Sequence, residues 1–299
     1  MNDAYKKQVQ LLLSVLPEVA KEECFAMHGG TAINLFIRNM PRLSVDVDLT
    51  YVPIQDRETS LAGINAALIS IKERIEGLRS TLQVQHKSQV CKLQVSEDGA
   101  LIKIEVNMIG RGSLGNVRRV QLCDAAQEQF DVFCVMPLVS MAQLYGGKIC
   151  AALDRQHPRD LFDVKFLLED DGFSDEIKQG FIWALAGSNR PTHELLEPNL
   201  LDQRVAFENQ FEGMSAEVFT YDDFEATRQE LINSITASLD QIDKQFLMSL
   251  NRLQPDWSHY PYQDFPSVRW KLRNLETFRN DKPESYQQQL SELERVLAK

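Results

Sequence analysis

Two aspartates separated by a single residue, Asp46 and Asp48, have the types and the spacing that metal-dependent chemistry needs. They lie in the run Val45-Asp46-Val47-Asp48-Leu49, whose alternation of apolar and polar residues predicts a β-strand with one buried face. Residues two apart on a strand point to the same side, so both carboxylates would face one way. Such a pair suits Mg²⁺ or Mn²⁺ in phosphoryl transfer, although an acidic pair on a strand can also simply face water.

Upstream of this pair, two glycines interrupt an apolar sequence. The run 24–27 predicts a short strand and the run 31–37 a helix, with Gly29 and Gly30 at the turn between them. Glycines at such a turn let the backbone approach a ligand closely, and the start of a helix presents unpaired N–H groups to an anion. The sequence therefore predicts a phosphate-binding turn, Gly29-Gly30-Thr31, near the two carboxylates.

A third carboxylate, Glu105, lies in another alternating run. In residues 101–108 the side chains of Lys103, Glu105 and Asn107 share one face of a predicted strand. If this strand lies beside the aspartate strand, Glu105 could bind the metal or act as a base for an attacking hydroxyl. A solvated strand face explains the same pattern equally well, so the sequence leaves both interpretations open.

A second group of charged residues lies much further along the chain. Lys148 and Arg155 are seven residues apart and fall on one face of a predicted helix, while Asp160 and Asp163 are neighbours on the next helix. The two cations could neutralise triphosphate oxygens, and an aspartate could fix a base, a ribose or the lysine. The alternative is a structural salt-bridge network that joins the two helices.

Several other functional classes lack their motifs. The five histidines are dispersed and show no zinc-binding spacing, and neither GxSxG nor GxGxxG occurs. Gly146-Gly147-Lys148 is not a P-loop, because Ile149 stands where that motif needs Ser or Thr. These absences leave the carboxylate pair as the main candidate for chemistry.

Composition sets the expected environment of the chain. The 299 residues carry a formal net charge of -11, which argues against nonspecific adhesion to nucleic acid or to an anionic membrane. Five cysteines without paired spacing fit a reducing compartment. No signal peptide and no membrane-spanning run is visible, so we expect a cytoplasmic protein without a membrane partner.

Strands and helices alternate up to about residue 135, whereas the rest of the chain has helical periodicity. We therefore expect a mixed α/β sheet domain over residues 1–135 and a mostly helical domain over residues 136–299. The sheet domain is predicted to contain helices at 3–23 and 56–78 and strands at 82–86, 90–95, 101–109 and 131–135. The helical domain is predicted to contain helices at 138–153, 159–169, 174–186, 222–250 and 283–297.

Together, the two groups of residues resemble the AbiEii/AbiGii family of nucleotidyltransferase toxins, which belong to type IV and related toxin–antitoxin systems. The resemblance rests on His28–Phe36, Arg42–Leu49 and Lys148–Asp163, and it covers the chain to about residue 170. It implies an α+β fold: a DNA polymerase β-like nucleotidyltransferase mixed sheet domain, followed by a helical domain that completes the active site.

The resemblance also implies roles for individual residues. Asp46 and Asp48 would bind the metal, Glu105 would be a further ligand that the toxin branch need not use, and Lys148 and Asp163 would match the family's further active-site lysine and aspartate. The expected contacts with the NTP are made by Gly29, Gly30, Thr31, Arg155 and Asp160. Gly30 stands where the wider superfamily usually has serine, so a hydroxyl contact would have to come from Thr31.

The leading hypothesis is a Mg²⁺-dependent enzyme that transfers NMP from an NTP to an acceptor hydroxyl, with RNA, and tRNA in particular, as the acceptor. The family further implies a toxin that acts with a cognate antitoxin protein. The alternatives are nucleotidyl transfer to a small molecule or a protein, and a non-catalytic module that binds a nucleotide or an antitoxin. An acidic chain needs a local basic strip to bind RNA, for which the candidates are Arg111, Arg118, Arg119, Arg269, Lys271, Arg273 and Arg279.

Overall fold

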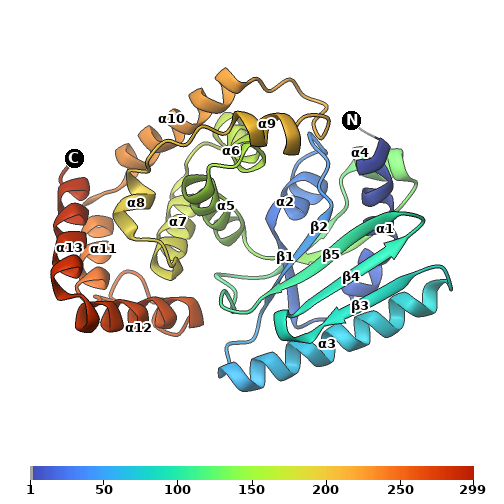
Figure 1. Cartoon of the computed structure of the whole chain (residues 1–299), viewed down its shortest axis with the longest axis horizontal. Coiled ribbons are helices and arrows are strands. Elements are labelled where there is room, and N and C mark those ends of the chain that lie inside the picture. Colours follow the sequence, from blue (N-terminus) through green and yellow to red (C-terminus); the bar gives the residue numbers. More distant parts are fainter. Residues whose placement is uncertain (1–2) are drawn as a thin grey trace. The chain divides into compact units, whose positions relative to one another are not determined.

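The computed structural model describes residues 3–299 and divides into two compact units (Figure 1). Unit 1 contains the chain up to Ser140 together with Phe211–Val218, and unit 2 contains Met141–Gln210 and Phe219–Lys299. Unit 1 holds all the strands of the described chain, and unit 2 is helical. None of the helices in the described residues has the length and apolar character needed to cross a bilayer.

Unit 1 is built on a mixed sheet of seven strands in the order β3-β4-β5-β2-β1-β7-β6. The pairs β1–β7 and β2–β5 are parallel, and the other neighbouring pairs are antiparallel. The strands are β1 Phe25–His28, β2 Asp46–Tyr51, β3 Gln83–Lys87, β4 Lys92–Glu97, β5 Ala100–Asn107, β6 Arg118–Gln121 and β7 Val135–Leu138. The aspartates of β2 therefore lie near the middle of the sheet, between β1 and β5.

Two long helices, α1 Asp3–Val19 and α3 Arg57–Leu78, cover one face of this sheet (Figure 1). α1 packs on β5 and α3 on β3 and β4, and the two helices contact each other. Alternation on the strands supplies the apolar side of this layer, with Val47, Leu93 and Ile104 fully buried. Each such side chain stabilises the fold by about 1.5–3 kcal/mol. The opposite face, which carries the aspartates, is polar.

The other helical segments of unit 1 are short. They are α2 Gly29–Ala32, the π-helix η1 Ile33–Ile37, the 3₁₀ turn η2 Ser88–Val90 and α4 Asp124–Phe130. The returning segment, Phe211–Val218, is held by backbone hydrogen bonds: Leu43 N–H donates to the Met214 carbonyl at 2.8 Å, and Ala216 N–H donates to the Pro41 carbonyl at 3.1 Å. This segment therefore joins the sheet unit next to the entry of β2.

Unit 2 consists of α5 Met141–Arg155, α6 Pro158–Asp170, α7 Asp175–Gly187, α8 Thr192–Leu196, α9 Arg204–Gln210, α10 Tyr221–Ser238, α11 Gln241–Asn251, α12 Pro266–Asp281 and α13 Pro283–Leu297. Its most extensive helix contact is between α5 and α7. Glycines make this approach possible: a Cβ on Gly180 would lie only 1.8 Å from the Ala142 carbonyl oxygen, and one on Gly146 would lie 2.2 Å from the backbone of Gly180.

The predicted α+β class is confirmed, and most of the predicted strands and helices are present. The prediction of a strand at 131–135 was wrong: Asp131 adopts a left-handed conformation (φ 51°) that ends α4, and the strand occupies Val135–Leu138. The predicted helix 222–250 is two helices, because Asp240 and Asp243 form a capping box that starts α11. The strand β6 and the helices α4 and α12 were not predicted.

Candidate active site

The carboxylates of Asp46 and Asp48 are half-buried on β2, and Val47 and Leu49 between and beside them are fully buried on the other face. Asp48 is paired with His28 of β1 on one side and with Glu105 of β5 on the other. Because residues directly opposite each other share a face, these side chains lie in one row across the sheet. The local geometry that the sequence predicted for the two aspartates is therefore present.

The glycine turn approaches this row closely. Gly29 has φ +78°, and a Cβ there would lie 2.3 Å from Asp48 Oδ2. Gly30 is also confined, because its Cβ would lie 2.7 Å from Arg42 Nη2 and 3.1 Å from Ser44 Oγ. A positive φ and a close carboxylate both require glycine at the first position. The turn and the aspartates are thus parts of one local structure.

The side chain of Thr31, for which the sequence predicts a contact with the NTP, lies between α2 and the start of β2. Its side chain is fully buried, and its hydroxyl donates to the Asp46 carbonyl oxygen and lies 3.0 Å from Ser44 Oγ. These contacts tie α2 to the start of β2. The Thr31 hydroxyl therefore positions the turn relative to β2, and its contact with the NTP stays a prediction.

Glu105 lies beside Asp48, but its side chain is 40% exposed and forms an ion pair with Lys92 of β4. In the described residues, no three or more His, Cys, Asp or Glu side chains are gathered closely enough to hold a metal ion. Mg²⁺ in phosphoryl-transfer sites is commonly held by one or two carboxylates together with substrate phosphates. Asp46 and Asp48 fit that requirement, and Glu105 is not needed for it.

The charged cluster of unit 2 is a buried ion network. Lys148 of α5 lies 3.0 Å from an oxygen of Asp160 and 2.9 Å from an oxygen of Asp163, both on α6. The three side chains are only 6%, 2% and 0% exposed. Arg155 donates to both oxygens of Asp160, at 2.5 Å and 3.0 Å, while 62% of its own side chain remains exposed.

This network balances two cations against two carboxylates. Burial disfavours the charged form of Asp160, but the charges of Lys148 and Arg155 outweigh that effect and hold the pKa of its carboxyl well below the usual range. The structural alternative raised by the sequence, a network joining two helices, therefore describes the cluster as it stands. Arg155 is the member whose side chain is most exposed to solvent.

The basic residues proposed for an RNA-binding strip separate into two kinds. Arg111 is buried and donates to the Asp56 carbonyl, and Lys271 is buried and donates to the Leu185 carbonyl at 3.0 Å. Burial also lowers the pKa of Lys271 to about 8. These two stabilise the fold and are not part of a surface strip. The exposed members are Arg118, Arg119, Arg269, Arg273 and Arg279.

The sequence did not identify one cation near the aspartates as a candidate site residue. Lys103 of β5 is paired with Asp46, as Glu105 is with Asp48. The alternation of residues 101–108 placed both on one face, but only the strand pairing shows which aspartate each one adjoins. His28 is the other neighbour, and its Nδ1 lies 3.1 Å from Thr50 Oγ1.

The fold is similar to that of a solved nucleotidyltransferase toxin. MenT4, a nucleotidyltransferase toxin from Mycobacterium tuberculosis H37Rv, matches it with a TM-score of 0.62 over 91% of this chain and 93% of that chain, at 14% sequence identity. None of the curated protein sequences is similar enough to count as a relative.

The chain belongs to the AbiEii family, the nucleotidyl transferase toxins of type IV toxin–antitoxin systems, whose family model matches residues 10–274. It is therefore an enzyme of the nucleotidyltransferase class and the toxin of such a system, as the resemblance implied. An NTP substrate and an antitoxin partner follow from that assignment, and the family generally uses a divalent metal.

Proposed function

We propose that this toxin transfers the nucleoside monophosphate of an NTP to a hydroxyl of an RNA acceptor, with the 3′ end of a tRNA as the first candidate, and that it requires Mg²⁺ or Mn²⁺. The observation that carries the proposal is the pair Asp46 and Asp48 on one face of β2, with the backbone of Gly29 packed against Asp48. That arrangement combines metal ligands with a turn suited to phosphate.

In the proposed reaction the acceptor oxygen forms a bond to the α-phosphorus, the bond between that phosphorus and the bridging oxygen to the β-phosphate breaks, and pyrophosphate leaves. The hydroxyl proton passes to solvent. A divalent metal, when bound, supplies positive charge that polarises the α-phosphate.

The chain's own residues prepare this step. Asp46 and Asp48 would hold the metal, and the turn at Gly29 and Gly30 would place backbone N–H groups beside the phosphates. Thr31 fixes the turn relative to Asp46 through their hydrogen bond.

The cluster of unit 2 is proposed to serve the nucleotide as well. Arg155, whose side chain is 62% exposed and whose guanidinium is oriented by Asp160, is suited to an anionic ligand such as a triphosphate. Lys148 and Asp163 are too deeply buried for much direct contact with solvent, so they would act chiefly by holding α5 against α6. Family membership supports an active-site role for this cluster.

The proposal is tested by incubating the purified protein with each α-labelled NTP, Mg²⁺ and total tRNA, and by following label into RNA. Digestion with nuclease and with protease separates an RNA acceptor from a protein acceptor. Asp48→Asn should lower the rate of transfer on the order of 100-fold or more, whereas substitution of Asp281, an exposed aspartate at the end of α12, by Asn should leave it unchanged. Label in a protein or in a small molecule, with none in RNA, would refute the RNA acceptor.

A further inference from the structure

A row of polar side chains crosses the sheet from the aspartates to the edge strand. In the strand register Asp46 of β2 is opposite Lys103 of β5, Lys103 is opposite Gln94 of β4, and Gln94 is opposite Gln85 of β3. Directly opposite residues share a face, so the three side chains Lys103, Gln94 and Gln85, here called the glutamine row, continue the face that carries the aspartates.

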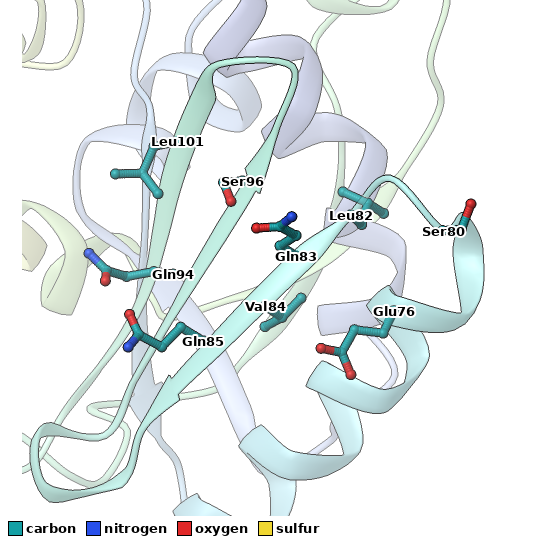
Figure 2. Close-up of a pocket in the computed structure, with 9 residues that line it drawn as sticks. All are labelled: Glu76, Ser80, Leu82, Gln83, Val84, Gln85, Gln94, Ser96 and Leu101. Atoms are coloured by element: carbon teal, nitrogen blue, oxygen red, sulfur yellow. The ribbon is translucent and has the colours of Figure 1, made fainter.

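The far end of the glutamine row enters a hollow of about 720 Å³ at the edge of the sheet (Figure 2). Figure 2 shows Gln85 beside Gln94 and Gln83 beside Ser96, and both pairs are opposite each other in the register of β3 and β4. The hollow is lined by Glu76, Ser80, Leu82, Gln83, Val84, Gln85, Gln94, Ser96 and Leu101. Five of these nine residues carry a carboxamide or a hydroxyl, three are apolar and one is a glutamate.

The chemistry of this surface does not suit a triphosphate. Glu76 is the one charged residue in the lining of the hollow, and it already pairs with Lys72 at 2.6 Å. Carboxamides and hydroxyls both donate and accept hydrogen bonds, as the edges of unpaired bases do. Leu101, 43% exposed, adds apolar surface for a base or ribose. The only cation of the row, Lys103, lies at the end next to Asp46.

The distance from the aspartates to the hollow also fits a short stretch of nucleic acid. Three strand-to-strand steps separate β2 from β3, which is roughly 14 Å at the usual spacing of strands. At a stacked rise of roughly 3.4 Å per nucleotide, this distance accommodates about four nucleotides. A chain of that length would reach from the hollow to the aspartates.

We propose that the glutamine row and the hollow bind the unpaired nucleotides that precede the reacting hydroxyl of the RNA acceptor. Lys103 contacts a backbone phosphate next to the aspartates, and the glutamines hydrogen-bond to bases. The assignment rests on the proposed function, because the row matters only if the acceptor is RNA. A peptide added to the edge of the sheet would instead use the backbone of β3 and would leave Lys103 and Gln94 without a role.

The test measures binding of fluorescently labelled total tRNA to the full chain, without NTP, by anisotropy over a series of salt concentrations. The variants are Lys103→Gln and the double variant Gln85→Ala/Gln94→Ala. Matched controls are Lys7→Gln, on the exposed surface of α1, and Gln288→Ala, on α13. Circular dichroism and thermal unfolding confirm that each variant is folded.

We expect the double variant to bind about 3–10-fold more weakly, as loss of one or two net hydrogen bonds implies. Lys103→Gln should reduce the slope of log affinity against log salt by about 0.7–0.9, the value for one phosphate contact. In the transfer assay the KM for tRNA rises by the same factor, and the KM for the NTP is unchanged. Both control variants behave like the unmodified protein.

Two results would overturn the assignment: tRNA affinity unchanged in the folded variants, or no measurable tRNA binding by the unmodified protein. Failure of the proposed function gives a different result. In that case the unmodified protein transfers no label to RNA. The transfer assay measures this independently of the anisotropy titration. An unchanged affinity together with label in RNA refutes the glutamine row alone.

Discussion

At the scale of single residues, the backbone of Gly29 is where the glycine turn meets the carboxylate pair. Gly29→Ala adds a strained backbone conformation, which costs about 1–3 kcal/mol, and it forces Asp48 to move because the new Cβ would lie 2.3 Å from Oδ2. A displaced carboxylate should lower the rate of label transfer on the order of 100-fold. The initial rate at saturating NTP measures this effect.

Gly99 provides a matched control for that substitution. It also has a positive φ, +80°, but a Cβ there meets nothing within 4 Å. Gly99→Ala should therefore lose similar stability in a urea titration and keep its transfer activity. Equal losses of activity in the two variants would show that strain alone, and not the position of Asp48, explains the effect.

Glu105 and Asp48 are neighbours in the sheet with different expected roles. Because Glu105 is paired with Lys92 and 40% exposed, Glu105→Gln should change the transfer rate less than about fivefold, the most that a surface ion pair of about 1 kcal/mol can contribute. Asp48→Asn should lower the rate on the order of 100-fold or more. Titration of the rate with Mg²⁺ compares the variants, and a large rise in the Mg²⁺ requirement of Glu105→Gln would make it a metal ligand after all.

At the scale of elements, the approach of α5 to α7 depends on two glycines. Gly180→Ala would place a Cβ 1.8 Å from the Ala142 carbonyl oxygen, so the helices must separate. We expect a loss of about 1–3 kcal/mol or more in the free energy of unfolding. Tryptophan fluorescence during urea denaturation is a suitable probe, because Trp183, Trp257 and Trp270 all lie in unit 2.

Gly147 is the control for this crossing, since a Cβ there meets nothing within 4 Å and the residue is exposed on α5. Gly147→Ala should raise stability by about 0.5–1 kcal/mol, through helix propensity alone. If Gly180→Ala proved as harmless as Gly147→Ala, the two helices would not be in close contact.

The ion network between α5 and α6 gives stability a defined pH dependence. Lys148→Met leaves Asp160 and Asp163 buried without their shared cation, and we expect it to cost about 3–5 kcal/mol near pH 7. Lys165→Met, which removes an exposed pair with Glu169 on α6, should cost less than about 1 kcal/mol. Urea midpoints of the two variants make the comparison.

The sign of the pH effect follows from Asp160. The pKa of Asp160 is lowered in the folded protein. Its contribution to the free energy of unfolding is therefore fully present above its pKa in the unfolded chain, about 3.9, and is lost only as the pH falls through its lower pKa in the folded protein. Without Lys148, burial favours the protonated carboxyls. The deficit in the stability of Lys148→Met should therefore shrink as the pH falls below 7, and a deficit independent of pH would contradict this account.

Elements differ in how far the sequence alone determined them. Strict alternation over residues 101–108 identified β5, and the spacing of Asp46 and Asp48 predicted their common face. The end of α4 at Asp131 and the break at Asp240 depend on left-handed or capping conformations that compete with periodicity. The burial of Thr31, Arg111 and Lys271 could not be inferred, because it is set by contacts between segments distant in the sequence.

At the scale of the whole molecule, the chain passes between the two units three times, after Ser140, Gln210 and Val218. A cut after residue 140 therefore separates the sheet from Phe211–Val218, which supplies the partner of Leu43 N–H and the buried side chain of Met214. Loss of a buried methionine and its contacts typically costs about 2–5 kcal/mol.

A fragment of residues 1–140 should accordingly be less stable, by about 2–5 kcal/mol, than the same fragment joined through a flexible linker to residues 211–218. Met214→Ala in the linked fragment should reverse most of the gain, since it removes the buried side chain but keeps the backbone bond from Leu43 to the Met214 carbonyl. Urea denaturation followed by far-ultraviolet circular dichroism measures all three forms. Equal urea midpoints for the linked and unlinked fragments would show that residues 211–218 do not stabilise the sheet unit. The linked fragment would then offer no gain in stability for binding studies of the glutamine row.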